Sequence, residues 1–89
     1  MSLSAAVHFG LNDKKVIAAI SELYRQKGYR MDDARCRVST REISEVAGIN
    51  IYQARYSLLK LKACGVIIQV DAAPKRMLYW RPAAFFPVS

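Results

Sequence analysis

The side chains best suited to chemistry lie between residues 51 and 64, where polar and aromatic residues alternate with apolar ones. The polar and aromatic members can reach phosphates and base edges, and they are Tyr52, Gln53, Arg55, Tyr56 and Lys60. On a helix they point largely away from a second set, which recurs at three and four residues and can pack inward: Ile51, Ala54, Leu58 and Leu61. Two tyrosines on an exposed arc are costly without a partner. The pattern therefore favours nucleic-acid contact over a plain solvated surface or a protein contact.

Capping signals make this helix the second of a pair. Ser39 and Glu42 have the spacing of a capping box, which predicts that a first helix begins there. Asn50 and Gln53 repeat the spacing at the start of the second helix. Gly48 lies where the first helix must end, because glycine adopts the left-handed conformation without a Cβ clash. The turn of residues 48–50 has the length that a helix-turn-helix requires.

A β-hairpin is expected after the second helix. Residues 66–70 are apolar and β-branched, which is typical of a strand, and residues 77–81 are expected to return beside them until Pro82 ends the pairing. Trp80 is expected to pack inward. Lys75 and Arg76 lie near the tip of the hairpin, from which they could contact a phosphate backbone. Two strands joined by a basic turn predict a wing, with its tip at about residues 71–76.

A third helix is needed before the pair, because two helices cannot enclose a core alone. We expect it to begin at Asn12 or Asp13 and to end near Gly28, with one apolar stripe formed by Val16, Ile17, Ile20, Leu23 and Tyr24. Residues 29–37 have no helical period and predict a long loop, which leads to a short strand at about residues 36–38. The elements predict a mainly α fold with a small β-hairpin: a winged helix-turn-helix, built as a three-helix bundle plus a wing.

Length and charge limit the possible classes of protein. The 89 residues have room for one domain, spanning residues 1–89, and no apolar run approaches the roughly 20 residues of a membrane helix. Fourteen Lys and Arg against seven Asp and Glu give a net charge of +7, which favours a polyanionic partner but could also serve solubility. The basic residues of the helix pair and wing could form one surface: Arg41, Arg55, Lys60, Lys62, Lys75 and Arg76. The preceding acidic residues are expected on the other side: Asp13, Glu22, Asp32 and Asp33.

Few residues could form a catalytic or metal site. The two cysteines, Cys36 and Cys64, are too few for a zinc site even with His8, which is far from either in sequence. We expect no metal, no cofactor and no enzymatic activity. A secretory signal is not recognisable, which favours reduced thiols and a cytoplasmic, nucleoid-associated protein. Cys64 is expected to pack at the end of the second helix, and Cys36 to lie in a strand.

The two ends of the chain are apolar, and each has more than one interpretation. The head, residues 1–11, includes Val7, Phe9 and Leu11, and the tail, residues 82–89, includes Phe85, Phe86 and Val88. The tail could fold back over the first helix or cover a partner chain. A homodimer formed through the head or the tail is therefore one alternative.

The run Tyr52-Gln53-Ala54-Arg55-Tyr56 resembles the recognition helix of the small winged helix-turn-helix regulators of bacterial fimbrial operons, the PapI/FaeA type. The similarity continues in residues of the same kind: Leu58, Leu59, Leu61, Gly65, Tyr79 and Trp80. It covers residues 40–80, and the YQARY run is fairly specific, because a helix-turn-helix does not require it. The resemblance implies a transcriptional regulator that binds promoter DNA together with a larger regulator, and it supports Gln53, Arg55 and Tyr56 as DNA contacts.

The sequence as a whole predicts a sequence-specific DNA-binding regulator of transcription. The helix of about residues 51–64 would enter the major groove of double-stranded DNA, with Gln53 and Arg55 reading base edges. Contacts to the DNA backbone would come from Tyr52, Tyr56, Lys60, Arg41, Lys75 and Arg76. The main alternative is a protein-docking module that acts on a larger DNA-bound regulator or on polymerase. An accessory domain of an enzyme ranks last, because the sequence supplies no site for it.

Overall fold

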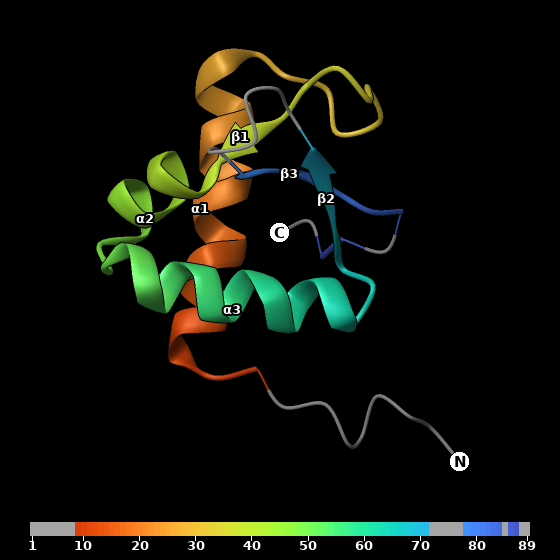
Figure 1. The fold of residues 1–89 in the computed structure, drawn as a ribbon. Coiled ribbons are helices and arrows are strands. Elements are labelled where there is room, and N and C mark those ends of the chain that lie inside the picture. Colours follow the sequence, from red (N-terminus) through yellow and green to blue (C-terminus); the bar gives the residue numbers. More distant parts are fainter. Residues whose placement is uncertain (1–8, 72–77, 85, 88–89) are drawn as a thin grey trace.

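The computed structural model describes residues 9–71, 78–84 and 86–87. The elements follow the order α1 (Leu11–Lys27), β1 (Val38–Ser39), α2 (Thr40–Ala47), α3 (Ile51–Ala63), β2 (Ile67–Asp71) and β3 (Leu78–Pro82). In Figure 1, α3 crosses the N-terminal half of α1, with α2 on one side of α1 and most of the sheet on the other. Three helices and a small antiparallel sheet confirm the predicted winged helix-turn-helix.

Both predicted capping boxes are present. The Ser39 hydroxyl accepts a hydrogen bond from the Glu42 N–H at 3.1 Å, and the Glu42 carboxylate accepts one from the Ser39 N–H at 3.0 Å. At α3, Asn50 and Gln53 exchange the equivalent bonds at 2.8 and 3.1 Å. Gly48 ends α2 with φ 72°, the left-handed conformation expected there. Residues 48–50 therefore form the tight turn that sets the angle between α2 and α3.

The core lies where α1 meets the helix pair and the inner side of the sheet. From α1 it takes Val16, Ile20, Leu23 and Tyr24, and from the other elements Val38, Ile43, Leu58, Leu61 and Trp80. Trp80 is fully buried, as predicted, and its indole N–H donates to the Thr40 hydroxyl at 2.8 Å. This bond ties the central strand β3 to the first residue of α2, so the sheet and the helix pair form one unit.

The sheet differs from the prediction in two places, at the start of β1 and at the end of β3. Its order is β1-β3-β2, with Val38 opposite Trp80. The short strand begins at Val38 rather than at Cys36, whose carbonyl instead accepts a hydrogen bond from the Tyr24 hydroxyl at 2.5 Å. Pro82 is the last residue of β3, opposite Ile67, and does not stop the pairing before it. A proline fits there because β1 pairs only as far as Trp80 and needs no N–H from Pro82.

Two details of the helices also differ from the prediction. α1 begins at Leu11, before Asn12, because the Asp13 carboxylate accepts a hydrogen bond from the Gly10 N–H at 2.8 Å and so fixes the first turn. On α3 the buried residues are Ala54, Ser57, Leu58 and Leu61. Ile51, predicted to pack inward, is 41% exposed, since Ser57 shifts the centre of the buried stripe away from it.

The described part of the tail packs on its own domain. Phe86 is buried and belongs to the core cluster, which supports the interpretation that the tail folds back. Phe9 of the head is partly buried against the same cluster, whereas Leu11 is exposed. Val7, Phe85 and Val88 lie outside the described residues. One aromatic residue of the head, Phe9, and one of the tail, Phe86, therefore pack on the core of their own domain.

Candidate nucleic-acid interface

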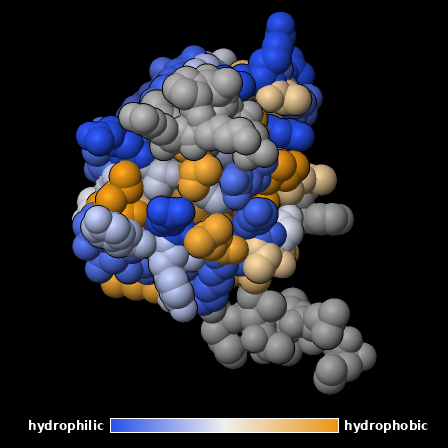
Figure 2. All heavy atoms as spheres, viewed as in Figure 1, coloured by the Kyte–Doolittle hydropathy of each residue, from blue (hydrophilic) through white to orange (hydrophobic). Residues whose placement is uncertain are grey.

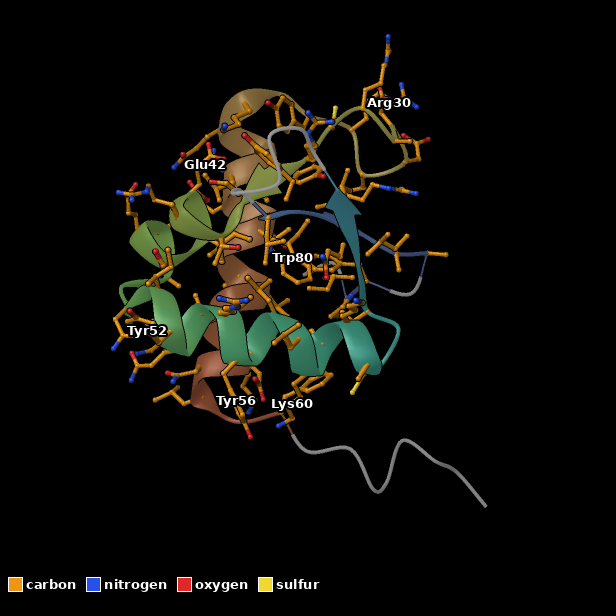
Figure 3. The ribbon with its side chains drawn as sticks, viewed as in Figure 1. Arg30, Glu42, Tyr52, Tyr56, Lys60 and Trp80 are labelled. Atoms are coloured by element: carbon orange, nitrogen blue, oxygen red, sulfur yellow. The ribbon has the colours of Figure 1, made fainter. Side chains whose placement is uncertain are left out.

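One face of α3 is exposed along its whole length and carries most of the predicted contacts. Tyr52 is 80% and Tyr56 75% exposed, and Arg55 lies between them on the same arc. We call Tyr52, Arg55, Tyr56 and Leu59 the α3 face. Figure 3 shows Tyr52 and Tyr56 projecting from α3 away from Trp80 and the sheet. In the space-filling view, apolar and hydrophilic side chains lie next to one another on this side of the molecule (Figure 2).

Gln53 has a structural task that the prediction of base reading did not include. It is exposed, but its carboxamide oxygen accepts the hydrogen bond from the Asn50 N–H. Reading an adenine edge with both the oxygen and the amide group would compete with this bond. The role of Gln53 in DNA contact stays a prediction, and the structure adds a role in starting α3.

Lys60 is held by a buried carboxylate. Its ammonium lies 2.8 Å from Asp13 Oδ2, with 39% of the Lys60 side chain and 5% of the Asp13 side chain exposed. Burial raises the pKa of Asp13, but hydrogen bonds from Lys60, the Gly10 N–H and Ser57 outweigh it and bring that pKa below its usual value. Tyr56 and Lys60 line a hollow of about 320 Å³ against the first turn of α1. The expectation that Asp13 lies on the other side was therefore wrong, because α1 crosses α3 at this residue.

Most of the acidic side chains are neutralised by local partners. Arg30 lies 3.1 Å from Asp32, Arg35 lies 3.1 Å from Asp33, and Arg25 pairs with Glu22. We call these three pairs the loop end, and Figure 3 shows Arg30 there, at the opposite end of the molecule from Tyr56. A further pair, Lys27 with Glu42, joins α1 to α2. The sequence of α3 contains no acidic residue at all.

The other predicted basic contacts fall into three groups. Arg41 is exposed on α2, together with Glu45. Lys62 is exposed near the end of α3, where its ammonium donates to the Gln69 side chain at 3.0 Å. Lys75 and Arg76, the predicted wing contacts, lie outside the described residues. Among the described basic residues, Arg41 and Arg55 thus lie on the two helices of the helix-turn-helix with exposed side chains.

Sequence reasoning missed Leu59 as part of this surface. Leu59 is 46% exposed, although Leu58 and Leu61 beside it are fully buried. The signal was present, because Leu59 follows Tyr52, Arg55 and Tyr56 at the spacings that define one helix face. Its place between Leu58 and Leu61, which both pack inward, concealed it.

The two cysteines differ in how much of each is exposed to solvent. Cys36 is half-buried and Cys64 is exposed, and both are free. Cys64 was expected to pack at the end of the helix, but it is the C-cap residue of α3 and lies outside the core. Within the described ranges, no three His, Cys, Asp or Glu side chains gather closely enough to hold a metal ion. None of the helices in those ranges is both long and apolar enough to cross a membrane.

The geometry joins a support helix, a helix-turn-helix and a wing sheet. The profile of the family described as FaeA-like protein matches residues 13–81. The chain belongs to the FaeA-like family. The match confirms the family that the YQARY run indicated, and it extends beyond residues 40–80 to include most of α1 and the loop before β1. No curated protein and no solved structure matches this FaeA-like chain at a significant level.

Proposed function

We propose that this FaeA-like protein is a sequence-specific DNA-binding regulator of bacterial transcription, with α3 as its recognition helix. The observation that carries the proposal is the α3 face: two tyrosines at least three-quarters exposed, an exposed arginine between them, and no acidic residue on the helix. Such a surface suits the major groove, which presents phosphates on both sides and hydrogen-bonding base edges between them. Family membership favours a role at fimbrial operons.

Within this proposal, the side chains have separate tasks. Arg55 reads a base edge from the middle of α3, and Tyr52 and Tyr56 contact the backbone with their hydroxyls. Arg41 reaches a phosphate from α2, and Lys75 and Arg76 reach one from the wing. Gln53 contributes to base reading with whatever hydrogen-bonding capacity its bond to Asn50 leaves. The mechanism requires no catalytic step, no metal and no cofactor.

Lys60 acts first as a positioning residue. Its ion pair with Asp13 joins the C-terminal part of α3 to the first turn of α1, so it holds the recognition helix at a defined angle. About two-fifths of the side chain is still exposed, so the same lysine can add charge to the edge of the interface. A contact of this kind pre-organises the helix before DNA arrives.

The alternative is a docking module that binds a larger DNA-bound regulator or polymerase. The exposed tyrosines and Leu59 are of a kind that also suits a protein interface. The two functions differ in salt dependence, because phosphate contacts lose affinity steeply as salt rises and an apolar protein interface does not. The lack of an acidic residue on α3 favours DNA as the partner.

The direct test is selection of duplexes from a random DNA library by the purified protein, followed by fluorescence anisotropy on the selected duplex. Arg55→Ala is expected to weaken binding to that duplex by about 1–3 kcal/mol and to leave binding to scrambled DNA nearly unchanged. Arg30→Ala is the matched control, because it removes the same charge from the loop end. Equal affinities of the parent and Arg55→Ala for the selected duplex, in two folded proteins, would refute the groove assignment.

A further inference from the structure

The α3 face is partly apolar in a way that charge and hydrogen bonding do not explain. Tyr52, Arg55, Tyr56 and Leu59 stand at positions i, i+3, i+4 and i+7, so they form one continuous stripe. The buried residues of α3 include Ala54, Leu58 and Leu61 and point to the opposite side. Leu59 is the last member of this stripe, and at 46% exposure it presents an apolar surface on the same side of α3 as Arg55.

A leucine side chain can make only apolar contacts, and the base edges present few apolar groups. In the major groove, the apolar group that distinguishes one base from another is the C5 methyl of thymine. Phosphates and the other base edges present mainly polar atoms that a leucine would desolvate without compensation, and sugars are the same at every base. On the groove-facing side of a recognition helix, Leu59 thus has thymine as its natural counterpart.

We infer that Leu59 is a specificity-determining residue that contacts a thymine methyl, and that the DNA bound by α3 carries thymine at that position. The inference rests on the proposed function and adds the identity of a base. Leu59 is one turn beyond Arg55, about 6 Å along the helix axis at 1.5 Å per residue. Successive bases on one strand are about 3.4 Å apart. Because a helix in the groove is inclined to the DNA axis, the thymine lies within about two base steps of the base that Arg55 reads.

The composition of the stripe favours DNA over a protein helix as its occupant. Arg55 lies within the stripe, and α3 supplies no acidic residue to neutralise it. At the loop end, by contrast, each arginine has a carboxylate within two or three residues. A polyanion with methyl groups between its charged backbones complements both the arginine and the leucine.

The test replaces thymine with deoxyuridine in the duplex selected by the protein, which removes the methyl group and keeps the base pairing. Burial of one methyl-sized group contributes about 0.8 kcal/mol, which is roughly fourfold in affinity. Uridine at the contacted position is expected to weaken the parent about fourfold, and uridine elsewhere is expected to have little effect. Leu59→Ala is expected to bind the thymine duplex about as weakly as the parent binds the uridine duplex, and to be insensitive to the replacement.

The matched control is Ile68→Ala, which removes an exposed apolar side chain from β2 rather than from α3. This variant is expected to keep the parent's affinity and its fourfold response to uridine. A parent that binds selectively but tolerates uridine at every position overturns the role of Leu59 and leaves the proposed function standing. A uridine effect of the same size in Leu59→Ala assigns the methyl contact to another residue and also overturns it. A protein that selects no duplex at all refutes the proposed function itself.

Discussion

The α3 face and the loop end contain similar side chains but use them in opposite ways. At the loop end, Arg25, Arg30 and Arg35 each pair with an acidic residue two or three positions away. On the α3 face, Arg55 stands between two exposed tyrosines on a helix without acidic residues. Local sequence spacing therefore decides where positive charge is neutralised. The net charge of +7 indicates a binding surface only when arginines paired with carboxylates are separated from those, such as Arg55, on a surface without acidic residues.

The largest effect is expected from breaking the support beneath the α3 face. Leu58 is fully buried, so Leu58→Ala leaves a cavity and is expected to lower the free energy of unfolding by about 2–5 kcal/mol. The neighbouring Leu59→Ala is the control, because Leu59 is half exposed and the change is expected to have little effect on stability. Chemical denaturation of both variants measures the difference. Equal losses for the two leucines would contradict the division of α3 into a buried and an exposed side.

Much of this division could be predicted from the sequence, since it depends on local signals. The capping pairs Ser39 with Glu42 and Asn50 with Gln53, and the glycine at position 48, act over a few residues, and the structure confirms each. The order of helices and strands followed from the same short-range patterns, and the YQARY run indicated the family that the profile match confirms.

Features that depend on how distant segments meet could not be predicted. The ion pair of Asp13 with Lys60 joins residues 47 positions apart, and only the crossing of α1 over α3 brings them together. The place of Pro82 within β3 depends on the short length of β1, which the sequence of β3 does not reveal. For the candidate site, the exposure of the tyrosines was predicted, and the same helical spacing would have placed Leu59 beside them. The DNA contacts themselves stay predictions.

A smaller effect is expected from the ion pair that fixes α3 to α1. Asp13→Ala removes hydrogen bonds from Lys60 and the Gly10 N–H, and is expected to lower the free energy of unfolding by about 1–3 kcal/mol at neutral pH. Asp32→Ala is the control, because Asp32 is an exposed residue of the loop end, and its loss is expected to be hardly measurable. A loss for Asp32→Ala as large as that for Asp13→Ala would contradict the contrast between the two regions.

The contribution of Asp13 is also expected to depend on pH. Its pKa in the folded protein lies below the usual value of 3.8, because the hydrogen bonds outweigh the effect of burial. The stabilisation is therefore fully present above pH 3.8 and is lost as the pH falls through the pKa of the folded state. Denaturation at several pH values should show the parent approaching Asp13→Ala as the solution becomes acidic. A stability difference that grows with acidity would contradict the direction of the shift.

The smallest effect on stability is expected at the loop end. Replacing both Arg30 and Arg35 by glutamine removes two exposed ion pairs, whose free energy is largely cancelled by solvent screening and side-chain entropy. The melting temperature is expected to change by about 4 °C or less. Thermal unfolding followed by circular dichroism measures this. A clear drop in melting temperature would show that these pairs hold the loop before β1 in place.

The central claim is that the positive charge used for DNA binding lies on α2 and α3 and not at the loop end. The salt dependence of DNA binding tests this claim most directly. Two double variants lower the net charge equally: Arg41→Gln with Arg55→Gln, and Arg30→Gln with Arg35→Gln. The claim predicts that the first variant flattens the plot of log affinity against log salt by as much as about 0.9 for each arginine that contacts a phosphate, and weakens binding to the selected duplex. It predicts that the second variant retains the slope and affinity of the parent. Equal changes in both variants would contradict the claim and assign DNA attraction to net charge alone.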